Sequence, residues 1–128
     1  MKYIILTLVF LSLSSLLFGQ SRIEFDSTVC HLGKYKEGER LDFNLCFRNK
    51  GKAPVSIVNA YEGGSVGVCD YSKKATLPGK KGCITWNHPT SGRVGKGQKQ
   101  VVVAFNDTTI YIKMHYEIVP KKENDPID

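Results

Sequence analysis

The residues of this 128-residue chain that are best suited to chemistry are four cysteines and three histidines: Cys30, Cys46, Cys69, Cys83, His31, His88 and His115. They are soft metal ligands, but none shows the C-x-x-C or H-x-x-x-H spacing that makes a metal site convincing. We expect His88, which precedes a proline, in a loop, and His115 on the solvent side of a strand. The sequence therefore predicts no metal ion and no other cofactor.

Acidic side chains do not indicate an enzyme either. Glu37 and Glu39 flank a glycine in a predicted turn, where solvated carboxylates are expected, so the paired acids of a glycosidase are not supported. The cysteines have a structural explanation as disulfides, which leaves no candidate nucleophile among them. We expect no catalytic activity.

The N-terminal segment has the pattern of a secretory signal peptide. Lys2 precedes an apolar run over residues 4–11, which is followed by serines and by the small residue Gly19. A membrane anchor needs roughly 20 unbroken apolar residues, so cleavage near Gly19 is favoured. The predicted organisation is a signal peptide over residues 1–20, one folded domain over 21–119 and a disordered polar tail over 120–128. The expected location is outside the cytoplasm, periplasmic or extracellular, without stable membrane insertion of the mature chain.

The chain is basic, with 18 Lys and Arg against 12 Asp and Glu, a formal net charge of +6. Cleavage removes one charge, that of Lys2, so the excess survives export. Outside the cytoplasm such an excess does not point to nucleic acid, and it suits solubility or contact with anionic envelope polymers. The candidate anion-binding residues lie in or near predicted connections that could gather at one end of the domain: Lys73, Lys74, Lys80, Lys81, Lys96 and Lys99.

Four cysteines in an exported domain are expected to pair, and three connectivities are possible. Cys30 and Cys46 are equidistant from Gly38, and Cys69 and Cys83 are equidistant from Thr76. Hairpins folded at these points would join each pair and close loops of about 15 residues, each stabilising by about 3 kcal/mol. An alternative bridge, from Cys46 to Cys83, would link outward positions on neighbouring strands.

The remaining sequence is typical of an all-β protein. Short runs with alternating apolar residues predict strands near residues 22–25, 41–47, 55–60, 66–71, 84–86, 100–105 and 109–118. The clearest is 41–47, and 55–60 is expected beside it. About seven strands favour an immunoglobulin-like antiparallel β-sandwich.

Several segments also resemble the bacterial domain-of-unknown-function 1573 family. The matching stretches include an Asn-x-Gly turn and the Pro-opened strand after it, and they cover residues 23–26, 32–39, 47–57, 77–82 and 105–107. The resemblance implies an exported immunoglobulin-like sandwich, often found in Bacteroidetes-type envelopes, with no established activity. Many members carry Cys-Gly-Cys after the Pro-opened strand. Here only Cys69 remains, so no metal, redox or catalytic role is carried over.

The expected function is that of an exported, non-enzymatic module that acts as a structural or protein-binding domain. Its expected partner is an unidentified protein or an envelope polymer, and no nucleic acid. Two alternatives stay open. One is a small periplasmic metal- or redox-handling protein that uses the Cys and His residues, and the other is a binder of anionic envelope polymers through the lysine-rich connections.

Overall fold

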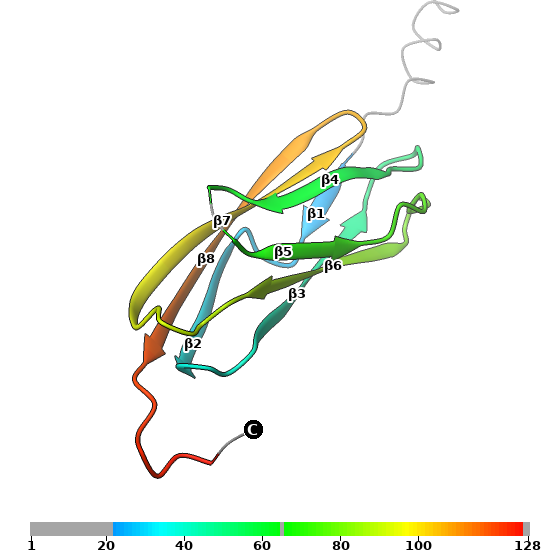
Figure 1. Cartoon of the computed structure of the whole chain (residues 1–128). Coiled ribbons are helices and arrows are strands. Elements are labelled where there is room, and N and C mark those ends of the chain that lie inside the picture. The colour runs from blue at the N-terminus through cyan, green and yellow to red at the C-terminus, as the bar shows by residue number, and fades with distance from the viewer. Residues whose placement is uncertain (1–21, 65, 127–128) are drawn as a thin grey trace, which may run out of the picture.

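The described residues form a sandwich of two four-stranded sheets that face each other (Figure 1). The structure is a computed structural model that describes residues 22–64 and 66–126, so the predicted signal peptide lies outside the described residues. The strands are β1 (Ile23–Phe25), β2 (Val29–Lys36), β3 (Leu41–Asn49), β4 (Ile57–Glu62), β5 (Val68–Tyr71), β6 (Lys81–His88), β7 (Gly95–Phe105) and β8 (Thr109–Val119). The predicted all-β sandwich is confirmed. Nowhere in these residues is there a helix long and apolar enough to span a membrane.

The pairing and the number of strands differ from the expected ones. One sheet has the order β1-β3-β6-β5 and the other β2-β8-β7-β4. The predicted neighbours 41–47 and 55–60 are therefore wrong as a pair, because β3 and β4 lie in different sheets. An eighth strand, β2, is present, and it pairs in parallel with β8, whereas the other strand pairs are antiparallel.

The core lies between the sheets and follows the alternation read from the sequence. On β3, Leu41, Leu45 and Phe47 are at most 3% exposed. They face the buried side chains of β7 and β8, which include Val101, Val103 and Ile112. Full burial of such a side chain stabilises by roughly 1.5–3 kcal/mol, so this alternation supplies most of the force that holds the two sheets together.

Residues 120–126 leave the sandwich after β8 and turn back toward β2. Asp125 accepts a hydrogen bond from Lys36 Nζ at 3.1 Å and another from the backbone N–H of Lys122 at 2.7 Å. These contacts are exposed and contribute little stability. The predicted disorder of residues 120–128 stays a prediction.

Candidate functional site

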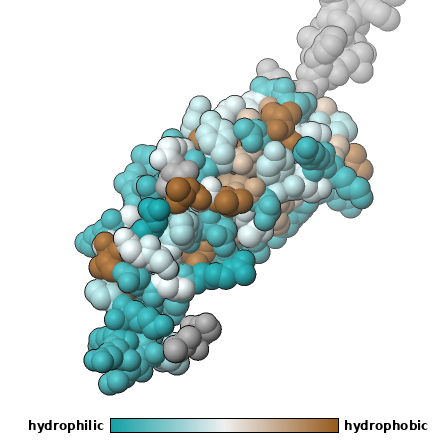
Figure 2. Space-filling view, in the orientation of Figure 1, coloured by the Kyte–Doolittle hydropathy of each residue, from teal (hydrophilic) through white to brown (hydrophobic). Residues whose placement is uncertain are grey.

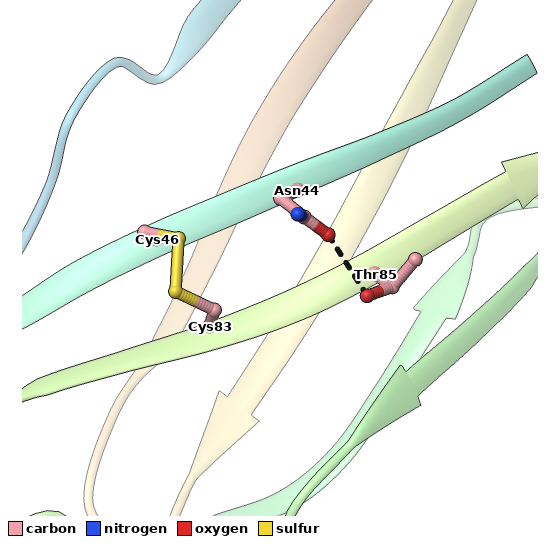
Figure 3. Close-up of a disulfide and its surroundings, with 4 residues drawn as sticks. All are labelled: Asn44, Cys46, Cys83 and Thr85. Atoms are coloured by element: carbon pink, nitrogen blue, oxygen red, sulfur yellow. Dashed lines mark hydrogen bonds between the residues drawn. A yellow bond between two sulfur atoms is a disulfide. The ribbon is translucent and has the colours of Figure 1, made fainter.

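The structure joins two of the four predicted disulfide residues, Cys46 and Cys83. They are directly opposite each other on β3 and β6, and their sulfur atoms are bonded (Figure 3). Leu45, Phe47 and Ile84 next to them point into the core, so the disulfide lies on the outward face of the sheet. On the same face Thr85 Oγ1 donates a hydrogen bond to Asn44 Oδ1 at 2.9 Å (Figure 3).

The two predicted hairpin bridges, Cys30–Cys46 and Cys69–Cys83, are wrong. The turn after β2 carries the chain from one sheet to the other, so Cys30 and Cys46 lie in different sheets. Cys69 does lie on the strand next to β6, but it is opposite Trp86. Positions 83 and 86 point to opposite faces because their separation is odd. The alternative bridge is the one formed, and Cys30 and Cys69 remain as free thiols.

Both free thiols are protected against reaction. Burial raises the pKa of Cys30, although a hydrogen bond with Ser27 partly opposes this effect. Burial, together with the negative charges of Glu62 and Asp70, raises the pKa of Cys69 to about 11. Because the thiolate is the reactive form, neither residue has the properties of a nucleophilic or redox-sensing cysteine.

We expect two free thiols per chain when the protein is unfolded without reductant, and four after reduction. In the folded protein at pH 8, Cys69 should be alkylated at least about tenfold more slowly than in the unfolded chain, because little of it is thiolate. Alkylation followed by mass spectrometry measures both quantities. A count of zero free thiols before reduction would contradict the structure.

The most unusual arrangement in the molecule is a buried polar cluster of Glu62, His88, Tyr116 and Trp86. Glu62 ends β4 at an inward position, and its carboxylate is fully buried. Its Oε1 accepts a hydrogen bond from Trp86 Nε1 at 3.2 Å, and its Oε2 accepts one from the backbone N–H of Gly67 at 2.7 Å. A Cβ at Gly67 would lie 2.6 Å from this carboxyl group, so glycine allows the close approach.

His88 lies between Glu62 and Tyr116. Its Nδ1 is 2.7 Å from Glu62 Oε1 without the alignment of a hydrogen bond, and its Nε2 is 3.1 Å from the Tyr116 hydroxyl. Burial lowers the pKa of His88 more than Glu62 raises it, and Arg93 and Lys99 lower it further. Burial, aided by Glu62, raises the pKa of Tyr116. At neutral pH both groups are therefore neutral, and the tyrosine hydroxyl can donate to the imidazole.

The pKa of His88 gives stability a pH dependence. The unfolded state, with a histidine pKa near 6.5, binds a proton more readily than the folded state. The free energy of unfolding should therefore be highest above pH 6.5 and fall as the pH is lowered through 6.5 toward the folded-state pKa. Thermal unfolding between pH 5.0 and 7.5 measures this fall. His88→Gln should flatten it, whereas exposed His31→Gln should keep it, and an unchanged slope in His88→Gln would contradict the assignment.

The sequence-based placement of His88 in a loop is wrong. It ends β6 and is 2% exposed, because Ile84, Trp86 and His88 alternate on the inward face. That alternation is the signal that could have located it, and the same spacing on β4 places Ala60 and Glu62 inward. His115, expected on the solvent side, is on the outward face and stacks on His31, with ring centroids 4.9 Å apart.

The six candidate lysines do not gather at one end of the domain. Lys73, Lys74, Lys80 and Lys81 lie between β5 and β6 or at the start of β6, and Lys81 pairs with Arg48 near the end of β3. Lys96 and Lys99 lie at the start of β7, whose opposite end, at Phe105, pairs with Ile57. The two groups are therefore at opposite ends of the sandwich (Figure 1).

Two further kinds of site are relevant to the part of the chain that the structure describes, a metal centre and a serine nucleophile. There, no three His, Cys, Asp or Glu side chains gather to hold a metal ion. Residues 63–67 have the Gly-x-Ser-x-Gly spacing that, in α/β-hydrolases, presents a nucleophilic serine between a strand and a helix. Here this segment connects strands β4 and β5, and Ser65 lies outside the described residues.

Two facing four-stranded β-sheets define an immunoglobulin-like sandwich domain. The chain belongs to the family described as "Protein of unknown function (DUF1573)", whose model matches residues 23–118. The resemblance found in the sequence is thus confirmed over nearly the whole domain. No curated protein matches the sequence.

Three solved structures with a similar fold share little sequence with this chain. A protein of unknown function from Porphyromonas gingivalis W83 is similar with a TM-score of 0.64 and 17% identity, covering 76% of this chain and 46% of that one. The PapD-like domain 7 of human CEP192 gives a TM-score of 0.57 and 12% identity, covering 78% and 87%. The secreted serine protease VesC from Vibrio cholerae gives a TM-score of 0.54 and 14% identity, covering 81% of this chain and 24% of VesC. This chain thus spans less than half of the Porphyromonas protein and about a quarter of VesC. The similarity concerns the fold alone.

Proposed function

We propose that this chain is an exported, non-enzymatic immunoglobulin-like module that acts by contact of its surface with a protein partner. The observation that carries the proposal is the Cys46–Cys83 disulfide on the outward face of β3 and β6. Cys83 is exposed, so cellular reductants would have access to the bond. Such disulfides persist in oxidising compartments and are rare in the cytosol.

The two free thiols are compatible with an oxidising compartment. Oxidation proceeds through the thiolate and requires access. Cys30 is 8% exposed, and Cys69 has a pKa of about 11, so both are poor targets. They can stay reduced while the exposed pair is oxidised.

The shifted pKa values support a non-enzymatic role. Burial raises the pKa of Cys69 and of Tyr116 and lowers that of His88, so each of these groups is held in its neutral form. Covalent catalysis requires a nucleophile that is activated and reachable. Tyr116, next to His88, is 8% exposed, and its raised pKa keeps the hydroxyl protonated, so it is not an activated nucleophile.

Exposed apolar side chains support contact with a protein. β4 and β5 are edge strands of the two sheets and contact each other along one side of the sandwich. This side carries Val58, Tyr61, Val66 and Val68, which are 46–60% exposed. Figure 2 shows hydrophobic residues in the middle of this face. Edge strands also present unpaired backbone groups, which another chain can use.

Chemical cross-linking in envelope extract tests the proposal. The folded protein should give a discrete cross-linked species that its reduced, alkylated and unfolded form does not give. Tyr61→Lys with Val68→Lys should abolish this species, and the matched pair Val29→Lys with Leu77→Lys, also at exposed apolar positions, should keep it. A folded protein that cross-links no more than the unfolded form would contradict a contact function.

A further inference from the structure

The inner face of β7 changes character along its length. Alternate residues of a strand share a face, so positions 95, 97, 99, 101, 103 and 105 all point toward the opposite sheet. The last three are Val101, Val103 and Phe105, each at most 4% exposed. The first three are Gly95, Gly97 and Lys99. On the inward face of β7 there is therefore no apolar side chain before Val101.

At the start of β7 lies an open hollow of about 330 Å³, within the lower range of small-ligand sites. Its lining residues are His88, Arg93, Gly95, Lys96, Gly97, Gln98, Lys99 and Tyr116. Gly95 leaves open the space that a side chain would fill, because nothing lies within 4 Å of where its Cβ would be.

The floor of the hollow is fixed by the buried polar cluster. Gly97 is opposite Tyr116, and a Cβ on Gly97 would lie 2.3 Å from the tyrosine ring. The ring therefore occupies the place of a side chain on β7. Its hydroxyl is held 3.1 Å from His88 Nε2, and His88 is 2% exposed. This floor carries polar atoms that do not depend on mobile surface side chains for their position.

The rim of the hollow carries three cationic side chains. Arg93, Lys96 and Lys99 make no salt bridge and no side-chain hydrogen bond within residues 22–64 and 66–126. Among the acids, Glu62 is buried next to His88, and Glu117 is opposite Lys96 in register. Arg93 and Lys99 act on His88 electrostatically, which places both charges near the floor.

We propose that this hollow binds an anionic group, a carboxylate or a phosphate, with Arg93 and Lys99 as the charged partners above a floor formed by Tyr116 and His88. A guanidinium pairs with either anion through two parallel hydrogen bonds, and a lysine adds a point charge. Lys96 and Lys99 are two of the six candidate lysines from the sequence, whereas Arg93 was not among them. The inference goes beyond the proposed protein contact, which lies on another side of the sandwich, so either can fail without the other.

Amide NMR titration of the purified protein tests the proposal, with inorganic phosphate in one arm and glucuronate in the other. Sodium chloride keeps the ionic strength constant in both. At least one anion should cause saturable shifts at Gly95, Gly97 and Lys99, and the arm that saturates identifies the anion. Arg93→Gln with Lys99→Gln should weaken this binding by about tenfold or more, because it removes both charged partners.

The matched control is Lys73→Gln with Lys74→Gln, which removes the same charge at the opposite end of the sandwich. It should leave the affinity unchanged. Absence of saturable shifts with both anions would overturn the proposal. The proposal would also be overturned if the Arg93 and Lys99 variant bound the anion with wild-type affinity, or if the Lys73 and Lys74 variant lost as much affinity. Dispersed amide spectra of both variants confirm that each is folded.

Discussion

Replacing Glu62 with alanine should lower the free energy of unfolding by about 3 kcal/mol or more. The change removes the acceptor of the Trp86 Nε1–H and of the Gly67 N–H and leaves both donors unpaired. It also opens a cavity, because the side chain is fully buried. Urea unfolding followed by the fluorescence of Trp86, the single tryptophan, measures the loss.

Two further variants give the Glu62 experiment its controls. Glu62→Gln keeps the size and one oxygen acceptor, so it should recover part of the loss. Glu24→Ala removes an acid that is exposed on edge strand β1, and should change stability by no more than about 0.5 kcal/mol. If Glu62→Ala cost less than about 1 kcal/mol, the buried carboxylate would not organise the cluster as described.

Removal of the disulfide is the second large effect expected. Cys46 and Cys83 are 37 residues apart, and closing a loop of this length restricts the unfolded chain by about 4 kcal/mol in the chain-entropy model. Measured values usually fall below this limit, so Cys46→Ser with Cys83→Ser should lose about 2–4 kcal/mol. Denaturant unfolding of the oxidised wild type and of the variant gives the difference.

Reductant provides an independent check on the same bridge. Dithiothreitol should lower the melting temperature of the wild type toward that of the double-serine variant, and it should leave the variant itself unchanged. Cys69→Ser, at a free thiol, should respond to reductant as the wild type does. A reductant effect that persists in the double-serine variant would show that another pair of cysteines is bonded.

Local patterns in the sequence were enough to predict the fold class and most of the strands. The alternation of Leu41, Leu45 and Phe47 with polar residues depends only on the period of two of a strand, and burial follows it. The turn after Phe105, at residues 106–107, likewise forms the expected short connection between β7 and β8. Strand β2 lacks such a regular alternation, and its backbone is held in the sheet by parallel pairing with β8.

The features that were missed depend on contacts between distant segments. Equal spacing of cysteines about a turn is a local argument, and it failed because the turn after β2 connects two different sheets. The buried cluster combines Glu62, His88 and Tyr116 from three strands, whose pairing no local pattern specifies. The hollow at the start of β7 depends on the same pairing, since Gly97 matters only because Tyr116 lies opposite.

We infer that the chain is exported and carries one disulfide on its surface. The most direct test is mass-spectrometric mapping of the protein from fractionated cells, which is alkylated without reductant before digestion. We predict a chain that begins near residue 21 and is found outside the cytoplasm. Its Cys46 and Cys83 peptides should be linked, and its Cys30 and Cys69 should be alkylated. A cytosolic chain that retains Met1 and has all four cysteines alkylated would contradict the claim.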